Sequence, residues 1–390
     1  MTSYDIRIAG HLDARWTAAF DTMSVTPRAD GTTSLRGEVV DQAALHGLLG
    51  RVRDTGLTLV SVTEEGDRMR AAVFDRFGGP EVVRVTDLPR PVPGPGELLV
   101  RVRATTVSAA DHRVRARDVP RGLRLPSAAV VGWFRPRRRV LGMDVAGEVA
   151  SIGDGVTGFA PGDAVVAMLG SRFGGHAEYA VVAATDAVVA APPSLSAAEA
   201  VALVFGGITA EAYLRQAELA PGARVLVNGA SGAVGTAAVQ LAKAAGAHVT
   251  GVASAPNHAL VRSLGADAVI DYATQDFASG RARYDVVVDC VGNAPVARVG
   301  GIVAPGGAVL LVAADLRGLL GAARASRLGI RAVTGPGDYR ADDLAHVVAL
   351  AERGELRPVI DRTFPLDGIV EAHRYVDGGR KRGSVVVTVP

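Results

Sequence analysis

The chain has 390 residues, 48% of them hydrophobic, and its 42 basic and 40 acidic side chains leave a formal net charge of only +2. This balance excludes the strong basic field of a typical nucleic-acid-binding protein, and no apolar run approaches the ~18 residues needed to span a bilayer. The length predicts two or three domains, and the N-terminus resembles no export signal, so we expect a cytoplasmic protein without nucleic-acid or membrane partners.

Residues 1–66 predict a small α+β domain. Strands are expected over residues 4–10, 23–29, 33–40 and 57–64, and helices over 12–21 and 41–56, with Asp41 as the N-cap of the second helix and Gly56 at its end. This β-α-β-β-α-β order is that of a ferredoxin-like sandwich. Open sheet edges suggest that the domain mediates self-association or contacts a partner protein. The alternative is a domain that only packs on the rest of the chain.

Residues 69–191 show a different sequence pattern. Short runs typical of β-strands alternate with glycine and proline turns, which predicts an antiparallel, barrel-like domain. The stretch between Asp111 and Leu141 carries nine arginines. They form either a basic flap over an anionic substrate or a solvated loop.

Residues 224–244, RVLVNGASGAVGTAAVQLAKA, give the clearest functional signal. A buried apolar strand runs into Gly229, Gly232 and Gly235, which open an apolar helix. Such glycines permit a tight turn, let a pyrophosphate approach the main chain and let the helix pack closely on the strand. The phosphates would bind the free N–H groups at the helix N-terminus. The pattern predicts a dinucleotide-binding turn.

The residues that follow predict the rest of a doubly wound parallel sheet. Further strands are expected over residues 248–254, 267–272, 284–292 and 307–313, and they are rich in valine without polar alternation. Strands of this kind are buried on both faces. The alternative is a fold of the same class that binds another ligand or none.

The loop after the second of these strands bears on the choice of cofactor. NAD-binding sites place an Asp or Glu there, but residues 252–257 contain no carboxylate. Ser254, Asn257 and Tyr272 could instead hold a 2′-phosphate, so we expect NADPH, although Pro256 stands where a cation would strengthen that contact. The single cysteine, Cys290, and eight scattered histidines exclude a structural zinc knot and make catalytic zinc unexpected.

Residues 69–390 resemble the medium-chain dehydrogenase/reductase superfamily, in its zinc-independent branch of quinone oxidoreductases. The resemblance is carried, in order, by AAVFDRFGGPEVV, PGPGELLVRVRATTVSAAD, LGMDVAGEVASIGDGVTGFAPGDAVVA, GGHAEYAVV, VFGGITAEAYL, NGASGAVGTAAVQLAKAAGA, SLGADAVIDY and DVVVDCVG. It implies a GroES-like catalytic domain over residues 69–192, a Rossmann domain over 193–325, and a return to the catalytic domain over 326–390. Ser108 and Met143 stand where zinc-dependent relatives carry metal ligands.

The resemblance also implies a cleft between the two domains and the residues that line it. The expected cofactor-binding residues are Thr209, Gly229, Ala230, Ser231, Gly232, Ala233, Val234, Gly235, Ser254, Asn257, Tyr272, Val291, Gly292, Val312, Ala313 and Arg382, with Lys381 as a further candidate. Ser108, Asp111 and His112 are the candidate catalytic groups, His112 either as a proton donor or as an exposed loop residue. Trp133 and Phe134 are expected to contact the substrate.

The activity that the resemblance implies is hydride transfer from NADPH, without zinc, to a small-molecule acceptor. That acceptor would be a quinone or the activated C=C bond of an α,β-unsaturated carbonyl compound. Two alternatives remain: a redox-inactive nucleotide-binding sensor or scaffold, and a redox-neutral isomerase or cyclase of a biosynthetic pathway. Relatives suggest a homodimer.

Overall fold

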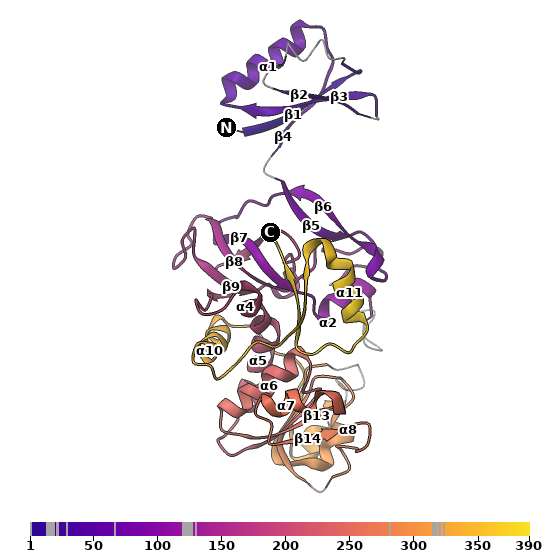
Figure 1. Ribbon diagram of the computed structural model, residues 1–390, viewed down its shortest axis with the longest axis vertical. Helices are drawn as coiled ribbons and strands as arrows, with labels where there is room; N and C mark the ends of the chain where they lie inside the picture. Colours follow the sequence, from indigo (N-terminus) through magenta and orange to yellow (C-terminus); the bar gives the residue numbers. More distant parts are fainter. Residues whose placement is uncertain are drawn as a thin grey trace. The chain divides into compact units, whose positions relative to one another are not determined.

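The computed structural model describes residues 2–12, 20, 23–28, 30–65, 68–118, 128, 131–280, 282–313, 318, 321–322 and 324–390. Its internal contacts divide the chain into two units. The first comprises residues 1–70 and 87–90, and the second residues 71–86 and 91–390 (Figure 1).

The N-terminal unit is an antiparallel sheet covered by a helix. Its strands are β1 (Thr2–Ala9), β2 (Ser24–Pro27), β3 (Thr32–Val39) and β4 (Leu59–Glu65), in the order β2-β3-β1-β4. Helix α1 (Gln42–Asp54) begins as predicted, because the Asp41 side chain accepts a hydrogen bond from the Ala44 N–H at 2.8 Å. Its buried Leu48 and Val52 pack with Ile6 of β1. The predicted helix over residues 12–21 lies mostly outside the described residues.

The second unit begins with the predicted barrel-like domain. Its main sheet contains β7 (Glu97–Thr106), β8 (Asp144–Ile152), β9 (Ala164–Met168), β10 (Tyr179–Ala183) and β11 (Ala187–Ala190), and β5 (Arg68–Phe74) pairs separately with β6 (Val83–Pro89). Two strands from the C-terminal end, β18 (Ile360–Pro365) and β19 (Ser384–Thr388), complete the main sheet. Because Val386 of β19 pairs with Thr106 of β7, the chain does return to this domain.

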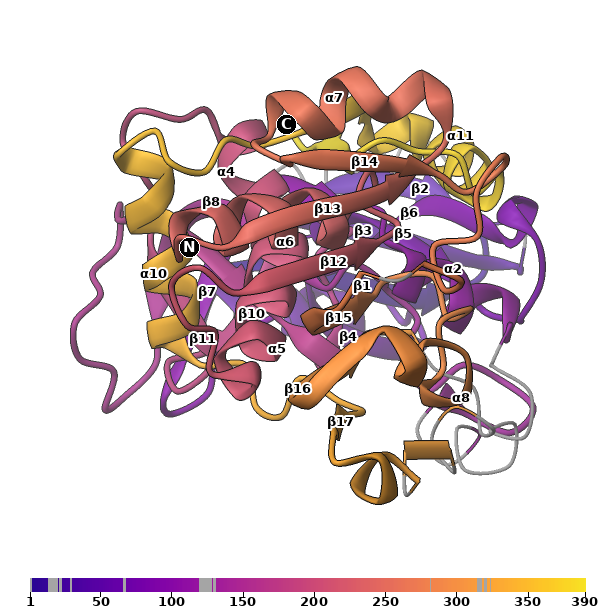
Figure 2. The same cartoon turned by 90° about the horizontal axis from the view of Figure 1, so that it is seen from below.

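The six-stranded sheet of the same unit is doubly wound and parallel. Its strands are β12 (Arg224–Asn228), β13 (His248–Ala253), β14 (Ala268–Asp271), β15 (Tyr284–Asp289), β16 (Val303–Leu311) and β17 (Arg331–Val333), in the order β14-β13-β12-β15-β16-β17 (Figure 2). The chain order reverses between β12 and β15, where ligands bind in sheets of this class. Strand β17 was not expected from the sequence.

Alternate residues of the central strand are buried on opposite faces of this sheet. Val225 and Val227 pack in one cluster with Leu241 of α6 (Ala233–Ala244), whereas Leu226 packs in another with Val299 of α8 (Val296–Val299). Helices α5 (Thr209–Ala217), α7 (His258–Ser263) and α10 (Ala341–Glu352) contribute to the first cluster. Burial on both faces explains the valine-rich strands of the sequence.

A continuous helix of α4 (Ala197–Leu203), a π turn (Val204–Ile208) and α5 connects the barrel-like domain to the parallel sheet. Residues 197–217 are long and apolar enough to cross a membrane, but 72% of the relevant stretch is buried inside the fold. This burial is typical of a core helix. Gly206 lets the π turn approach the start of α6, since a Cβ atom there would lie 2.4 Å from the Ala233 carbonyl oxygen.

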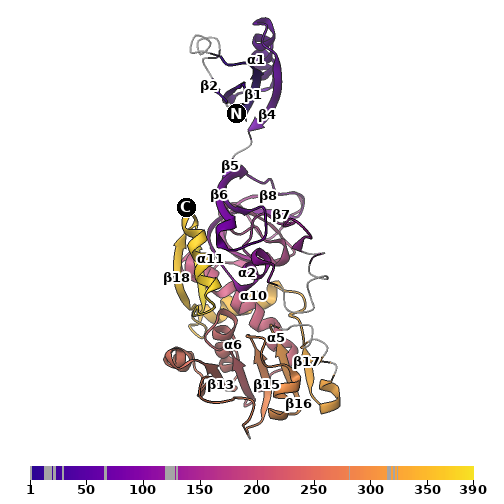
Figure 3. The ribbon, with the colours of Figure 1, turned by 90° about the vertical axis from the view of Figure 1, so that its right-hand side faces the viewer.

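Near the C-terminus, α11 (Ile369–Asp377) lies beside α2 (Ala109–Ala116), as Figures 1 and 3 both show. Leu366, Ile369, Ala372 and Val376 join the core of the barrel-like domain. Residues 378–383 then lead from α11 into β19. This short connection contributes directly to the candidate site.

Candidate functional site

A cavity of about 1060 Å³ lies at the carboxyl ends of β12, β13 and β15, where the order of the parallel sheet reverses. Its walls come from the glycine turn, from these strand ends, from α2 and from the connection after α11. The principal lining residues are Ala109, His112, Phe205, Asn228, Gly229, Ser231, Gly232, Ala233, Val234, Gly235, Ser254, Asn257, Tyr272, Cys290, Val291, Asp377, Arg380, Lys381 and Arg382.

The glycine turn has the geometry that the sequence predicts. Gly229 has a φ of +82°, a conformation that favours glycine. At Gly235 a Cβ atom would lie 2.1 Å from the Gly229 carbonyl oxygen, so only glycine lets α6 approach the turn this closely. Gly232 caps α6 without any side-chain hydrogen bond to its first turn. The N–H groups at this helix end therefore remain available to an anionic ligand.

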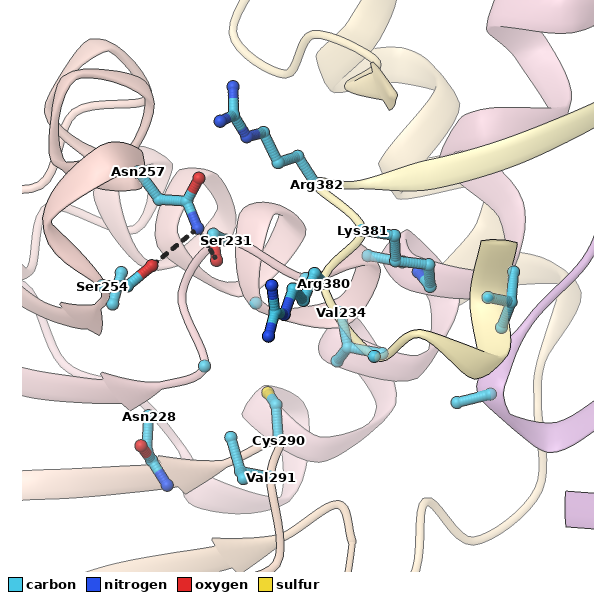
Figure 4. Close-up of a pocket in the computed structure, with 18 of the residues that line it drawn as sticks. Asn228, Ser231, Val234, Ser254, Asn257, Cys290, Val291, Arg380, Lys381 and Arg382 are labelled. Atoms are coloured by element: carbon cyan, nitrogen blue, oxygen red, sulfur yellow. Dashed lines mark hydrogen bonds between the residues drawn. The ribbon is translucent and has the colours of Figure 1, made fainter. Parts of the chain in front are cut away.

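A polar cluster borders the glycine turn on the β13 side. The Asn257 Nδ2 lies 3.2 Å from the hydroxyl oxygens of both Ser231 and Ser254, whereas its Oδ1 is buried without a partner (Figure 4). Because both hydroxyls can donate or accept, the amide can present either its oxygen or its NH₂ group to a ligand. Tyr272 lines the same end of the cavity and is 61% exposed. These are the residues at which the sequence predicts a ribose and its 2′-phosphate.

The connection after α11 brings three cations to the glycine turn. Gly383 N–H donates to the Ser231 carbonyl oxygen at 2.8 Å, and the Arg382 N–H donates to the Asp361 carboxylate at 2.8 Å. In Figure 4 the Arg380 guanidinium is directed toward Cys290, and Arg382 extends toward the side on which Asn257 lies. The main chain thus fixes these arginines beside the turn while their heads stay exposed to the cavity.

Lys381 differs from its two neighbours because its ammonium group is enclosed. It donates to the Gly383 carbonyl oxygen at 2.6 Å. Burial lowers the pKa of Lys381 to about 8, although the nearby Asp361 and Asp144 carboxylates act in the opposite direction. Such a cation in a cavity wall is a candidate for a functional role.

A buried ion pair holds the start of this connection to α2. The Arg115 guanidinium is fully buried, and its Nη2 lies 2.6 Å from both carboxylate oxygens of Asp377, the last residue of α11. His112 Nδ1 also lies 2.6 Å from Asp377 Oδ1. His112 and Asp377 both line the cavity. Arg115, expected in a basic flap or a solvated loop, is instead buried, and its pairing with Asp377 could not be predicted because 262 residues separate the two.

The structure corrects the expectation that Ser108 and Asp111 face the cleft. Both are buried and neither lines the cavity. Ser108 is the N-cap of α2, and Asp111 accepts hydrogen bonds from its N–H and hydroxyl, and from the Gly142 N–H at 2.8 Å. The spacing Ser-x-x-Asp before a helix is a signal for this capping box. The two residues therefore position α2, while His112 alone of the three candidates reaches the cavity.

Several other predicted site residues do not line the cavity. Trp133 and Phe134 are 50% and 93% exposed and do not line the cavity, so the expected substrate contact is not found there. Thr209 is buried, and its hydroxyl lies 3.3 Å from that of Tyr339. Four further predicted residues do not line the cavity: Ala230, Gly292, Val312 and Ala313. Burial raises the pKa of the Cys290 thiol, as expected for a residue that is not a nucleophile.

Of the two positions where zinc-dependent relatives carry metal ligands, Ser108 caps α2, and Met143 is followed by a carboxylate that is already hydrogen-bonded. Asp144, next to Met143, is fully buried and accepts hydrogen bonds from the Thr106 N–H and hydroxyl at 2.8 and 2.7 Å. Desolvation raises the pKa of Asp144 to about 7. Within the described part of the chain, no group of three or more His, Cys, Asp or Glu residues could hold a metal ion.

Comparisons with known proteins agree with this architecture. Three family models match: Domain of unknown function (DUF8691) over residues 3–63, Alcohol dehydrogenase GroES-like domain over 94–193, and Zinc-binding dehydrogenase over 264–387. The chloroplastic quinone-oxidoreductase QR1 of Triphysaria versicolor is 36% identical, over 83% of this chain and 99% of that protein. The trans-enoyl reductase pgmF of Aspergillus terreus is 31% identical, over 76% of this chain and 87% of that protein.

A solved structure extends the likeness to three dimensions. The quinone oxidoreductase from Coxiella burnetii superimposes with a TM-score of 0.73 and 28% identity, over 83% of this chain and all of that chain. Together with the glycine turn, the doubly wound sheet and the C-terminal return, these matches confirm the superfamily that the sequence resembles. The chain belongs to the medium-chain dehydrogenase/reductase superfamily, which makes it an oxidoreductase with quinone oxidoreductases among its relatives.

Proposed function

We propose that the protein is an NADPH-dependent, zinc-independent reductase of quinones or α,β-unsaturated carbonyl compounds. The observation that carries the proposal is the convergence, in one cavity, of the glycine turn, the Ser231–Ser254–Asn257 cluster and the cations Arg380 and Arg382. Among the described residues, two carboxylates line the cavity, Asp118 and Asp377, and both lie beside His112 of α2. An adenosine 2′-phosphate would therefore meet donors and positive charge.

The described residues fit this cofactor. The unpartnered N–H groups at the start of α6 would bind the pyrophosphate, and the absence of a side chain at Gly232 leaves the main chain open to it. The unpartnered amide atom of Asn257, with Ser254 and Arg382, would recognise the ribose end. When bound, the reduced nicotinamide supplies a hydride to the electrophilic carbon of the acceptor.

His112 is the residue that we propose to exchange a proton with the substrate. Its Nδ1 is held by Asp377, and its Nε2 lies 3.5 Å from Asp118 at the cavity wall. The Asp377 contact fixes the ring on α2, and the Asp118 contact leaves Nε2 at the surface that a substrate would approach. Ser108 and Asp111 support this placement by capping α2.

The residues present do not fit a catalytic zinc ion. Ser108 is committed to the helix cap, and both Asp144 oxygens accept hydrogen bonds from Thr106. We therefore expect reductase activity that survives dialysis against a chelator, with far less than one zinc ion per chain by elemental analysis. Activity restored only by added zinc would contradict this part of the proposal.

The central experiment measures oxidation of NADPH and of NADH with quinones and α,β-unsaturated ketones, in wild type and in Arg382→Ala and Asn257→Ala. A charge-assisted contact to the 2′-phosphate contributes about 1.5–3 kcal/mol, so each variant should raise KM for NADPH at least tenfold and leave KM for NADH nearly unchanged. Arg374→Ala, an exposed arginine of α11 paired with Glu371, is the matched control. Equal losses with both nucleotides would contradict the assignment. NADPH binding without consumption would favour a sensor or a redox-neutral enzyme.

A further inference from the structure

A loop outside the nucleotide cavity presents two aromatic side chains to solvent. Trp133 and Phe134 are 50% and 93% exposed, and Phe134 is the most exposed of the large hydrophobic side chains among the described residues. Large apolar side chains of a globular protein are ordinarily buried, and contiguous exposed ones mark interaction sites. Two neighbouring aromatics at this exposure therefore require an explanation that the cavity does not provide.

The loop is held in a defined shape. The Arg137 N–H donates to the Val131 carbonyl oxygen at 2.9 Å, which closes the segment 131–137. Gly132 has a φ of +119°, and a Cβ atom there would lie 2.1 Å from the Arg135 carbonyl oxygen. Only glycine permits this close turn, which leaves Trp133 and Phe134 between the two hydrogen-bonded ends.

The C-terminal side of the loop is tied to the barrel-like domain. The Phe74 N–H donates to the Arg139 carbonyl oxygen at 2.9 Å, and Val73 pairs with Val140. The Arg139 guanidinium donates to the Asp75 carboxylate at 2.6 Å. The aromatic pair is thus carried on an anchored loop rather than on a free chain end.

Positive charge surrounds the aromatic pair. Arg135, Arg137 and Arg138 are exposed, and none of the three has a carboxylate partner among the residues that the structure describes. Arg139 differs from them because its charge is compensated by Asp75. The loop therefore combines an apolar tip with three exposed cations that no carboxylate of the described residues neutralises.

This combination is complementary to the surface of an anionic bilayer. Tryptophan and phenylalanine are favourable at the boundary between headgroups and acyl chains, and exposed arginines are attracted by acidic lipid headgroups. Single-stranded nucleic acid also binds aromatic and basic residues, but it needs a basic groove along which successive bases stack. A short anchored loop with its aromatics at the tip suits insertion better than stacking.

We propose that the loop of residues 132–139 docks the protein on anionic lipid membranes by inserting Trp133 and Phe134 between headgroups that Arg135, Arg137 and Arg138 neutralise. The sequence predicts no membrane partner because no segment could span a bilayer, but docking at the interface needs no spanning segment. The proposal does not depend on the reductase activity, because the loop lies outside the nucleotide cavity.

Fluorescence of the full-length protein tests the proposal directly. The chain has two tryptophans, so Trp16→Phe leaves Trp133 as the only one. Vesicles of phosphatidylcholine with about one third phosphatidylglycerol should shift Trp133 emission to shorter wavelength and sediment the protein, whereas phosphatidylcholine alone should do so weakly. Since a basic residue near such a surface contributes about a fivefold gain in partitioning, replacing Arg135, Arg137 and Arg138 by glutamine should lower vesicle affinity roughly 100-fold.

Matched variants distinguish docking by the loop from nonspecific adsorption to vesicles. Phe134→Ala should weaken vesicle binding at least tenfold, and Val92→Ala, at a side chain 85% exposed elsewhere, should leave it unchanged. High salt should reduce binding to the acidic vesicles. Sedimentation that all variants share would overturn the proposal, and so would absence of vesicle binding. A Trp133 shift caused by NADP⁺ or by a single-stranded oligonucleotide, with none on vesicles, would overturn it in favour of a flap or a nucleic-acid contact.

Discussion

Replacement of Asp377 by asparagine tests whether the ion pair with Arg115 holds the C-terminal connection in place. The Arg115 side chain is fully buried, whereas that of Asp377 is 24% exposed. Without the carboxylate the guanidinium keeps its contact with the Gly78 carbonyl oxygen at 2.7 Å, but its charge is uncompensated in the interior. Breaking a buried pair from one side costs about 3–5 kcal/mol, and the partial exposure of Asp377 places the expected loss of unfolding free energy near 3 kcal/mol.

A double-mutant cycle makes this expectation specific. Asp377→Asn should destabilise the protein more than Arg115→Met together with Asp377→Asn, because the double variant leaves no buried charge. Glu371→Gln is the control, since Glu371 pairs with Arg374 on the exposed face of the same helix and should cost less than about 1 kcal/mol.

The assays are urea unfolding followed by circular dichroism and, in parallel, nucleotide titration. Residues 378–383 follow Asp377 directly and carry Arg380 and Arg382 into the cavity, so Asp377→Asn should also raise the dissociation constant for NADPH. A loss below about 1 kcal/mol, equal to that of Glu371→Gln, would refute the reasoning, because it would show that solvent screens the pair.

Three further changes test the site and its surroundings. Gly235→Ala places a Cβ atom 2.1 Å from the Gly229 carbonyl oxygen and should lower the free energy of unfolding by about 1–3 kcal/mol. At Gly232 a Cβ atom would lie 3.6 Å from the same oxygen, so Gly232→Ala should be tolerated. Equal melting temperatures of the two variants in thermal unfolding would contradict this. The pKa of Asp144 is raised from 3.8 to about 7 in the fold, so protonation of this carboxyl favours the folded state below pH 4. This stabilisation is lost as the pH rises through 7, and the loss of unfolding free energy reaches about 4 kcal/mol. In Asp144→Asn this pH dependence should be absent from urea unfolding. The pKa of Lys381 is lowered from 10.5 to about 8, so the folded state gains stability relative to the unfolded state from pH 8 to 10.5. Lys381→Met should therefore stabilise the protein by roughly 1–3 kcal/mol at pH 7 while weakening NADPH binding. A loss of stability would instead show that the hydrogen bond to Gly383 outweighs the desolvation of the charge.

The architecture of the nucleotide half could be predicted from the linear chain. A strand buried on both faces must be apolar along its whole length, so its sequence reveals it. The contact with the Gly229 carbonyl allows only glycine at position 235, so the glycine pattern also appears in the sequence. The cap at Asp41 was equally predictable, because an N-cap depends only on groups within three residues. The expected NADPH preference and catalytic role of His112 stay predictions until they are measured.

Which polar side chains reach the cavity depends on long-range packing that no local pattern reveals. Ser108, Asp111 and His112 lie within one turn and a half of the chain, yet the packing of α2 buries the first two in its cap and turns the third toward Asp377. The cavity cations Arg380, Lys381 and Arg382 come from the C-terminal end of the sequence, because β19 pairs with β7 and the Gly383 N–H donates to the Ser231 carbonyl oxygen. Local patterns specify groups that interact within a few residues; contacts across more than two hundred residues depend on how the finished sheets and helices pack.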